Sequence, residues 1–541
     1  MVVDAVELHR LPWIRPLVAA HALSYPTVSS LFAGNPADPV AWQKTIARVQ
    51  RPRGRSDVIS AVLARQLMRR GAPEPARAAA NRLTDPRTVV VVTGQQVGLF
   101  GGPLYTLLKG ITAVRLAREL SQAHGVPVVP LFWAEAEDHD WDEVRSATFL
   151  GREGGSTRIT LAGVDGAGSH SCGSLRLSAE VTSALASLEE TLPATDFTAD
   201  VLRVLRRCYA PDERLGTAFA RWLDHLLGPL GMPVCEADDP SAKPLVADLF
   251  AHELSAPRRT SQLVNTAGHL MQGLGHSPQL QPGDDATGLF YLDSSGRRPI
   301  KFADPVYQIG DRSHCVADLV SEASAHPERF SPNVLLRPIV QDRLFPTICY
   351  VAGPSELAYQ AQLAEVYSEF GVQRPILRAR VSATLVDPPT RRLFEKYRIH
   401  LEVLQPQSDA ALNELLSATL PTKIVETITG IQAQVAQGAA VLRGELGTID
   451  PTLIGAVDTT VTKIDDTLKS LHGKIIQASK RKEETFRRQF NHARSLTFPD
   501  GHPQERALSL TVFVNRYGSR LADQLLDQLP IDAGRHYVLG V

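Results

Sequence analysis

An acidic segment around one histidine holds the densest group of side chains that could do chemistry. Residues 133–143 carry six carboxylates, and the single histidine, His139, lies between Asp138 and Asp140. Neighbouring carboxylates favour the protonated form of an imidazole and can orient its ring. The pattern therefore predicts His139 as a general base, with Asp138 and Glu137 as its catalytic neighbours.

The same segment allows two other interpretations. Its carboxylates could bind an ammonium group, or a divalent metal through oxygen ligands, although we predict no metal site. Asp142 and Glu143 are explained largely as acidic residues that complement the dipole at the start of an exposed helix.

A glycine-rich turn with two glutamines is the second candidate. Residues 93–102 read Thr-Gly-Gln-Gln-Val-Gly-Leu-Phe-Gly-Gly and follow four consecutive valines. Free amides and the helix dipole at such a strand-to-helix turn attract an anion, so Gly94, Gln95 and Gln96 could bind a ligand. The spacing matches neither the Walker motif nor G-x-G-x-x-G. A tight structural turn is the alternative, but such a turn does not require two glutamines.

Two further clusters follow much later in the chain. Arg337 and Arg343 bracket an apolar run. Guanidinium groups suit the bidentate recognition of carboxylate or phosphate, although either arginine could form a structural ion pair. Residues 353–356, Gly-Pro-Ser-Glu, form a second strand-to-helix turn. If the two turns belong to neighbouring strands, Ser355 and Glu356 lie beside the glutamines, which predicts one central site.

The elements that would position these residues indicate a parallel α/β sheet. Val89 to Val92 is a β-branched run typical of a strand buried on both faces. Helical spacing of apolar residues begins at Leu104, and Gly125 suits the left-handed end of that helix. Residues 126–133 form a second apolar strand, which completes a β-α-β unit with a right-handed crossover. A second such unit over 345–386 predicts a Rossmann-like sheet interrupted by insertions.

The remaining chain is divided by changes of pattern. We expect a Rossmann-like core over 1–390, in which about 150–330 is polar, glycine-rich and irregular and forms connecting segments and smaller lobes. A helical coiled-coil hairpin should cover 391–500. Residues 501–541 should pack back on the core as a C-terminal tail.

The hairpin is predicted from apolar residues on three- and four-residue steps over 424–449 and 453–475. Two helices of about 40 residues each would form an antiparallel coiled coil roughly 60 Å long. Its apolar seam could close within the hairpin or bury against a second subunit, and we expect a homodimer.

Composition limits the class of partner. The 541 residues have a net charge of −1, with 43% hydrophobic and 21% charged residues, as in a globular chain of more than one structural unit. The charge gives no reason to bind nucleic acid or an anionic membrane. We find no signal-peptide pattern and no run of about 20 apolar residues, so we expect a cytoplasmic protein. The five cysteines lack the spacing of a zinc ribbon or a disulfide framework.

Four motifs in register resemble those of the BshC family, which is identified with cysteine addition in bacillithiol biosynthesis. The tripeptide Gln504-Glu505-Arg506 also resembles the C-terminal signature of that family, so the resemblance covers essentially the whole chain. The motifs are Thr-Gly-Gln-Gln-Val-Gly-Leu-Phe-Gly-Gly-Pro-Leu-Tyr at 93–105, Phe-Trp-Ala-Glu-Ala-Glu-Asp-His-Asp at 132–140, Ser-Pro-Asn-Val-Leu-Leu-Arg-Pro at 331–338 and Tyr-Val-Ala-Gly-Pro-Ser-Glu-Leu-Ala-Tyr at 350–359.

The resemblance implies a Rossmann-like core similar to nucleotidyltransferases and class I aminoacyl-tRNA synthetases, with connecting lobes and a coiled coil that makes a dimer. It also implies the last step of bacillithiol synthesis, in which the carboxyl group of cysteine is joined to the amine of glucosaminyl malate. A carboxylate is a poor electrophile, so this reaction needs an activated acyl group, most simply one made from ATP. The sequence carries no standard ATP motif.

We expect both substrates in one cleft between the two turns. Arg337 and Lys109 would hold the malate carboxylates, and His139 would take the proton from the attacking amine. The predicted substrate-binding residues are Gly94, Gln95, Gln96, Tyr105, Lys109, Trp133, Asp140, Asn333, Arg337, Gly353, Ser355, Glu356 and Tyr359.

Two other functions would share these features. An adenylate-forming or nucleotidyltransferase-like enzyme that acts on another amino acid or amine would have the same fold and a different pocket. A non-catalytic coiled-coil scaffold whose Rossmann-like domain binds a metabolite is the alternative from another class. Thiol analysis of a deletion strain distinguishes the bacillithiol enzyme from an enzyme that acts on another substrate. Titrations with cysteine, glucosaminyl malate and ATP test whether the protein is a non-catalytic scaffold.

Overall fold

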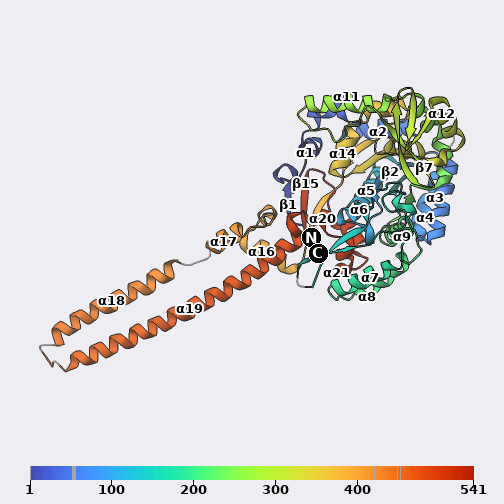
Figure 1. Ribbon diagram of the computed structural model, residues 1–541. Helices are drawn as coiled ribbons and strands as arrows, with labels where there is room; N and C mark the ends of the chain where they lie inside the picture. Colours follow the sequence, from blue (N-terminus) through green and yellow to red (C-terminus); the bar gives the residue numbers. More distant parts are fainter. Residues whose placement is uncertain (1, 51–55, 153, 418–421, 447–448, 451) are drawn as a thin grey trace. The chain divides into compact units, whose positions relative to one another are not determined.

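The computed structural model describes residues 2–50, 56–152, 154–417, 422–446, 449–450 and 452–541. The chain forms two compact units (Figure 1). Unit 1 comprises Met1–Val386 together with His502–Val541, and unit 2 comprises Asp387–Gly501. Among the described residues, no helix combines the length and the apolar character that crossing a membrane requires.

A sheet of five parallel strands lies at the centre of unit 1, which confirms the predicted Rossmann-like α/β fold. The four valines of its central strand are fully buried, as expected for a strand covered on both faces. The strand order is β13-β12-β2-β3-β6, with β13 at Ile376–Ala379, β12 at Thr347–Ala352, β2 at Val89–Gln96, β3 at Val128–Glu135 and β6 at Val234–Glu236.

The first β-α-β unit positions the two glutamines. Helix α5, Leu104–His124, joins β2 to β3 and ends at Gly125, whose φ of 65° is left-handed as predicted. The β2–β3 pairing continues to Gln96 and Glu135, so β2 is longer than expected. Gln95 and Gln96 therefore lie on the strand end and not in the turn.

The second unit differs from the prediction after its helix. Helix α14, Pro354–Ala361, follows β12 as expected. The extended segment that ends at 386 is two strands, β13 and β14, and not one. Strand β14, Ser382–Val386, leaves the central sheet and joins a three-stranded sheet with β1, Val2–Glu7, and β15, Arg535–Gly540.

The segment 150–330, predicted as irregular, is largely regular. It supplies β6 to the central sheet, and it contains helices such as α9, Leu215–Leu227, and α11, Arg259–Gly273. It also contains four strands of an antiparallel sheet in the order β10-β9-β8-β7-β11. These strands are β7 Ala286–Asp293, β8 Gly296–Ala303, β9 Val306–Ile309 and β10 Arg312–Cys315, and β11 is Phe330–Pro332.

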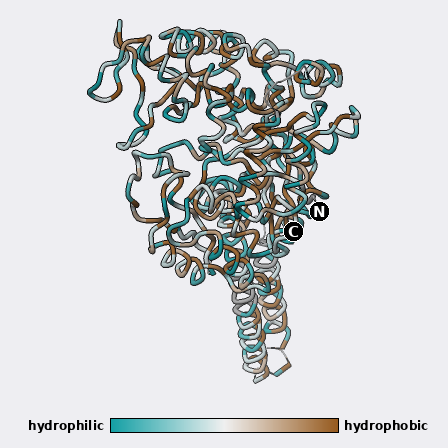
Figure 2. Tube along the Cα trace, turned by 90° about the vertical axis from the view of Figure 1, so that its right-hand side faces the viewer, coloured by the Kyte–Doolittle hydropathy of each residue, from teal (hydrophilic) through white to brown (hydrophobic). Residues whose placement is uncertain are grey.

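Unit 2 contains the predicted hairpin, formed by α18, Thr422–Leu446, and α19, Leu453–Thr497. Gln432 bonds to Asp465 and Arg443 to Asp458, so the helices run antiparallel. Hydrophobic and hydrophilic residues alternate along both helices (Figure 2).

The expectation of two equal helices is wrong, because α18 has 25 residues and α19 has 45. The rest of α19 packs against two short helices, α16, Pro388–Tyr397, and α17, Ala410–Ser417.

Candidate active site

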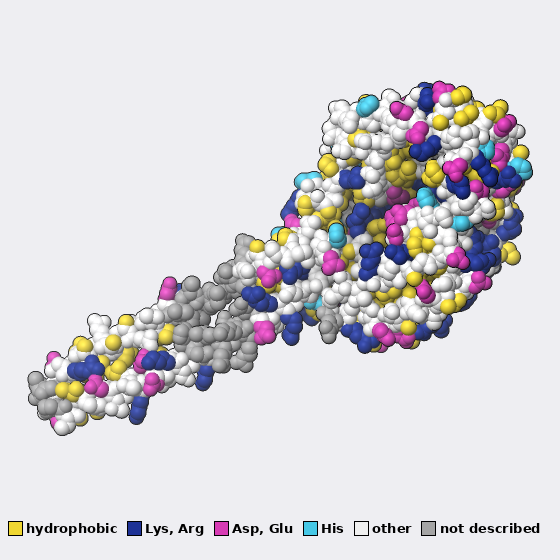
Figure 3. Space-filling model, viewed as in Figure 1, with side chains coloured by type: hydrophobic (Ala, Val, Ile, Leu, Met, Phe, Trp, Pro, Cys, Tyr) yellow, Lys and Arg dark blue, Asp and Glu magenta, His cyan; other side chains and the backbone are white. Residues whose placement is uncertain are grey.

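A cavity of about 470 Å³ opens at the carboxyl edge of the central sheet. The surface is hollowed there, with basic and acidic side chains around the opening (Figure 3). Its volume lies within the range of small-molecule sites, about 300–1,000 Å³. Both predicted turns contribute to its walls, which confirms that they converge. The predicted residues that line it are Gly94, Gln95, Gln96, Tyr105, Lys109, Trp133, Asp138, His139, Asn333, Arg337, Gly353, Ser355, Glu356 and Tyr359.

An ion pair between buried Lys109 and partly exposed Glu356 joins the two strand-to-helix corners. Lys109 Nζ also donates to the carbonyl oxygen of Gly94 at 2.7 Å and to Gln95 Oε1 at 3.0 Å, so all three of its hydrogens are used. Burial lowers the pKa of this ammonium group. Lys109 therefore holds protein groups in place, and the expectation that it holds a malate carboxylate is wrong for this arrangement.

Glu356 is equally saturated. It accepts hydrogen bonds from the hydroxyl of Tyr350 at 2.6 Å and from the amide of Gly353 at 2.7 Å. Burial by itself would raise the pKa of Glu356, but Lys109 and these two donors outweigh burial and lower it. Glu356 is thus an ionised structural support of the cavity wall.

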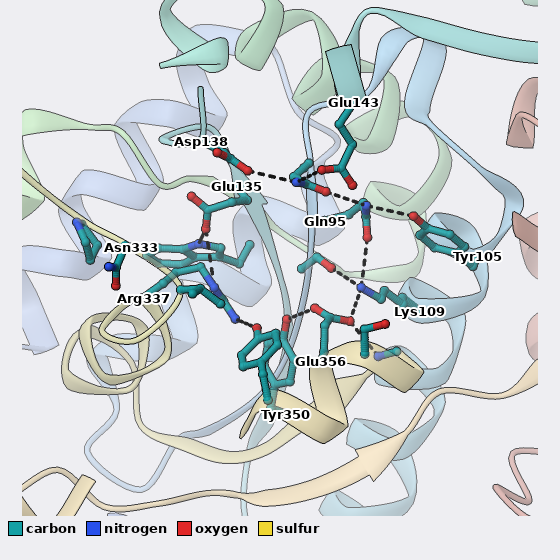
Figure 4. A pocket seen from close by; sticks show the side chains of 18 of the residues that line it. Gln95, Tyr105, Lys109, Glu135, Asp138, Glu143, Asn333, Arg337, Tyr350 and Glu356 are labelled. Atoms are coloured by element: carbon teal, nitrogen blue, oxygen red, sulfur yellow. Dashed lines mark hydrogen bonds and ion pairs between the residues drawn. The ribbon is translucent and has the colours of Figure 1, made fainter. Parts of the chain in front are cut away.

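The two glutamines relay hydrogen bonds from this ion pair to an acidic wall (Figure 4). Gln95 Oε1 accepts from Lys109, and Gln95 Nε2 donates to the hydroxyl of Tyr105 at 3.2 Å. Gln96 Nε2 donates to Asp138 Oδ2 at 3.0 Å and to Glu143 Oε2 at 2.6 Å. A glutamine at position 96 therefore holds two carboxylates side by side, which a small turn residue could not do.

Glu143 lies at an exposed helix start, as predicted, but it also faces the cavity. It belongs to the four-residue helix α6, Trp141–Val144, and its side chain lines the cavity. Burial raises its pKa, the bond from Gln96 opposes this, and the charges of Asp138 and Asp140 add to it. Glu135 lines the same wall and accepts from the indole of Trp133 at 2.9 Å.

His139 lines the cavity but does not have the predicted protonation. Arg297 Nη1 lies 2.9 Å from His139 Nδ1, so Nδ1 must act as the acceptor and the ring is neutral. Burial, followed by the charge of Arg297, lowers the pKa of His139, and Asp138 and Asp140 raise it less. The interpretation of a protonated His139 is therefore wrong. The nitrogen that could take a proton is already occupied by Arg297.

Two other predicted residues lie outside the cavity. Glu137 is buried and forms an ion pair with Lys243, because the chain turns inward after β3. Burial raises its pKa. Asp140 accepts from the amide of Glu143 at 3.2 Å as the cap of α6, and it lines a neighbouring shallow hollow instead. Neither side chain reaches the wall that the two glutamines and Glu143 form.

Arginines and polar groups form the remaining walls. Arg337 donates to the hydroxyl of Tyr359 at 2.5 Å and to Gln341 at 3.1 Å. Both ends of the Asn333 amide bond to the main chain, at Thr287 and Leu335. Arg343 lies outside the cavity in an ion pair with Asp248 at 2.5 Å, which fits the structural alternative. Lining residues for which sequence reasoning assigned no role are Glu135, Phe290, Arg297, Pro332, Val334, Tyr350, Pro354, Arg380 and Arg506.

Three amides in the later part of the glycine-rich turn and at the start of α5 are already occupied, whereas Gly94, Gln95 and Gln96 line the cavity as predicted. The amide of Gly101 donates to the hydroxyl of Tyr209 at 3.0 Å, and that of Gly102 donates to the carbonyl of Leu99 at 3.1 Å. At the start of α5, the amide of Leu104 donates to the carbonyl of Leu508 at 2.9 Å. Protein groups therefore occupy these donors.

First-turn amides at α14 are the clearer candidates to hold a phosphate group. Ser355 and Glu356 line the cavity, and the first main-chain bond of the helix runs from Leu357 to Gly353, which leaves the two earlier amides without a partner in the helix. Within the described part of the chain, no group of three or more His, Cys, Asp or Glu side chains is placed to hold a metal ion.

Comparison with known proteins matches both parts of the chain to one family. Residues 1–381 match "Bacillithiol biosynthesis BshC, N-terminal Rossmann-like domain", and residues 383–541 match "Bacillithiol biosynthesis BshC, C-terminal coiled-coil domain". A protein of Salinibacter ruber is 34% identical over 513 residues, which cover 93% of each chain. Proteins of Chlorobaculum tepidum and Geobacillus thermodenitrificans are each 32% identical; the alignments cover 82% of this chain and 81% and 83% of theirs. All three carry the name "Putative cysteine ligase BshC".

Proposed function

Because the chain belongs to the bacillithiol biosynthesis BshC family, we propose that it is a cysteine ligase that joins the carboxyl group of cysteine to the amine of glucosaminyl malate. One observation carries the proposal: a single cavity has an acidic wall of Glu135, Asp138 and Glu143 and also holds four arginines. The acidic wall suits an amine, and the arginines suit a carboxylate. Cysteine and glucosaminyl malate each carry both groups. The five cysteines are unpaired, which fits a cytoplasmic enzyme.

Glu143 is the proton acceptor in this proposal. An amine that attacks an acyl group must lose a proton, and the best base has a pKa near the working pH. Burial raises the pKa of Glu143 in that direction. One of its oxygens accepts from Gln96, and the other meets no hydrogen-bond partner among the residues that the structure describes. Asp138 is less suitable, because it accepts from Gln96 and from the amide of His139.

ATP is the proposed activating substrate, and it would supply the energy to convert the cysteine carboxylate into an acyl adenylate or acyl phosphate. Ser355 and the first-turn amides of α14 would hold a phosphate group. The ion pair of Lys109 with Glu356 keeps this corner beside Gln95, so the donors are oriented before substrate binds.

The exposed apolar seam of unit 2 supports a homodimer. Val441 is 62% exposed and Ile449 is 75% exposed, and an apolar groove of about 420 Å³ lies between α18 and α19. Apolar surface of this kind is typical of an interface, so we propose that a second copy covers it. Light scattering should give twice the chain mass for the wild type and the single-chain mass for Val441→Glu. A monomeric wild type would contradict the dimer.

The purified protein should form bacillithiol from cysteine, glucosaminyl malate and ATP, measured by mass spectrometry. Glu143→Gln should lower kcat at least about 100-fold, because it removes the base. Asp142→Asn is the matched control, since Asp142 is exposed and pairs with Arg145. Chromatography of the nucleotide products distinguishes AMP from ADP.

Three outcomes would count against the proposal. Failure of the wild type to form product with any nucleoside triphosphate would reject the ligase function. Near-normal turnover by Glu143→Gln would remove Glu143 from the mechanism. Product formation with another amine, but not with glucosaminyl malate, would favour an enzyme of the same fold and a different substrate.

A further inference from the structure

The cationic side chains of the cavity are not equally available to a ligand. In the described part of the chain, five of them line it: Lys109, Arg297, Arg337, Arg380 and Arg506. Lys109 and Arg337 are engaged by the protein groups given above. Arg297 donates to Ser331 Oγ at 3.1 Å and to the carbonyl of Pro332 at 2.9 Å, besides its contact with His139.

Both terminal nitrogens of Arg380 are also engaged, and its Nε is buried. Its two terminal nitrogens each lie 2.8 Å from an oxygen of Glu505, and both side chains are buried. Arg506 is exposed and, among the residues that the structure describes, its side chain makes no hydrogen bond or ion pair. Of the five cations, Arg506 alone is therefore free to bind an anion without breaking a bond within the protein.

Arg506 is held in place by the two residues before it. Gln504 accepts from the amide of Leu385 at 2.7 Å and donates to the carbonyl of the same residue at 2.8 Å. Glu505 accepts from Ser382 Oγ at 2.9 Å and from the amide of Ala383 at 3.0 Å, besides Arg380. Helix α20, Gln504–Ala507, is thus fixed against β14. The backbone is rigid, and the free side chain of Arg506 projects from it at the cavity wall.

Tyr105 offers a second donor on the same side. Its hydroxyl oxygen accepts from Gln95, but its hydroxyl hydrogen meets no acceptor among the described residues. Arg506 and Tyr105 line the same cavity, and burial raises the pKa of Tyr105 while the charge of Arg506 opposes that rise. A guanidinium group beside a free phenolic hydrogen is a suitable receptor for a carboxylate.

We propose that Arg506 and the Tyr105 hydroxyl bind a carboxylate of the malyl group, so that the C-terminal segment sets the specificity for the acceptor substrate. This inference rests on the proposed function. The cysteine carboxylate is a less suitable occupant, because it loses its charge when it is activated, whereas the malyl carboxylates keep theirs throughout the reaction.

Steady-state kinetics with two acceptors test the assignment. The acceptors are glucosaminyl malate and methyl glucosaminide, which has the same amine but no carboxylate. Arg506→Gln should raise the KM for glucosaminyl malate at least about tenfold, the loss expected for a charged hydrogen bond, and change kcat much less. The KM for methyl glucosaminide should stay unchanged. Arg506→Lys should recover part of the loss, and exposed Arg520→Gln is the matched control.

Calorimetry with glucosaminyl malate alone separates this inference from the ligase proposal, because binding needs no turnover. We expect the wild type to bind and Arg506→Gln to bind at least about tenfold more weakly. If the wild type binds glucosaminyl malate more tightly than Arg506→Gln does but forms no product, the proposed function fails and the carboxylate site stands. Equal binding by both proteins, no binding by the wild type, or an equal loss with both acceptors would overturn the site.

Discussion

Replacing Glu505 by glutamine should destabilise unit 1 by about 3–5 kcal/mol, the usual cost of removing one partner from a buried ion pair. The two oxygens of Glu505 together accept four hydrogen bonds, from both terminal nitrogens of Arg380, from Ser382 Oγ and from the amide of Ala383. In either orientation, a glutamine would point its amide hydrogens at a donor. It would also leave the buried guanidinium without a counter-charge.

Urea unfolding followed by tryptophan fluorescence measures this loss in unit 1 alone, because all five tryptophans lie between residues 13 and 222. The exposed Glu328→Gln is the control and should change the free energy of unfolding by less than about 0.5 kcal/mol. A loss below about 1 kcal/mol in Glu505→Gln would refute the argument that this pair is desolvated and essential.

The pH dependence provides a second check on Glu505. Burial raises its pKa, but Arg380 and the other donors outweigh burial and lower it. A carboxyl group whose folded pKa is depressed contributes stability above its unfolded pKa of about 4.3, and this contribution is lost as the pH falls through the folded pKa. The difference between wild type and Glu505→Gln should therefore be constant near neutrality and shrink below about pH 4.

Three further predictions concern the cavity and the core. Gln96→Glu should place a third carboxylate beside Glu143 and raise the pKa of Glu143. Activity should then be lost near neutral pH and return at higher pH. An unchanged acid limb of the pH–rate profile would contradict the role of Gln96 in the hydrogen-bond relay. Gly101→Ala should destabilise unit 1 by about 1–3 kcal/mol in urea, because φ is 89° and a Cβ would lie 2.6 Å from the Trp222 ring; full stability would contradict this close packing. In native protein at pH 8, Ellman's reagent should modify only exposed Cys315 rapidly, because the other four thiols are buried and their pKa values are raised by burial; rapid reaction of more than one thiol would contradict this.

The sequence predicted the parts of the fold that depend on local pattern. The run of four valines predicted the buried strand β2, and Gly125 predicted the left-handed end of α5. The Gly-Pro pair at Gly353 predicted the start of α14. Their convergence followed from a general property of parallel sheets, whose carboxyl ends share one edge. Strand β6 could not be predicted in this way, because three residues are too few to display a period.

The site was predicted less completely, because its electrostatics depend on distant partners. His139 has acidic neighbours in sequence, but in the fold it faces Arg297, which comes from β8 in the segment expected to be irregular. Glu137 stands two residues from Glu135, yet it turns inward to Lys243. Lys109 lines the cavity as predicted, but it forms an ion pair with Glu356, a partner that the sequence alone does not reveal.

Unit 2 interrupts unit 1 between Val386 and His502. Near these junctions, hydrogen bonds link the two sides of the chain within each unit. On the unit 1 side, the side chain of Gln504 bonds to the main chain of Leu385. Within unit 2, Asp387 bonds to His492 at 2.7 Å, so the inserted segment brings its own two ends together. A disordered loop of this length would oppose that closure by about 4 kcal/mol of chain entropy. Folding of the inserted hairpin should therefore assist the docking of α20, which carries Arg506, against β14. A short tether in place of the hairpin should also keep these two elements together.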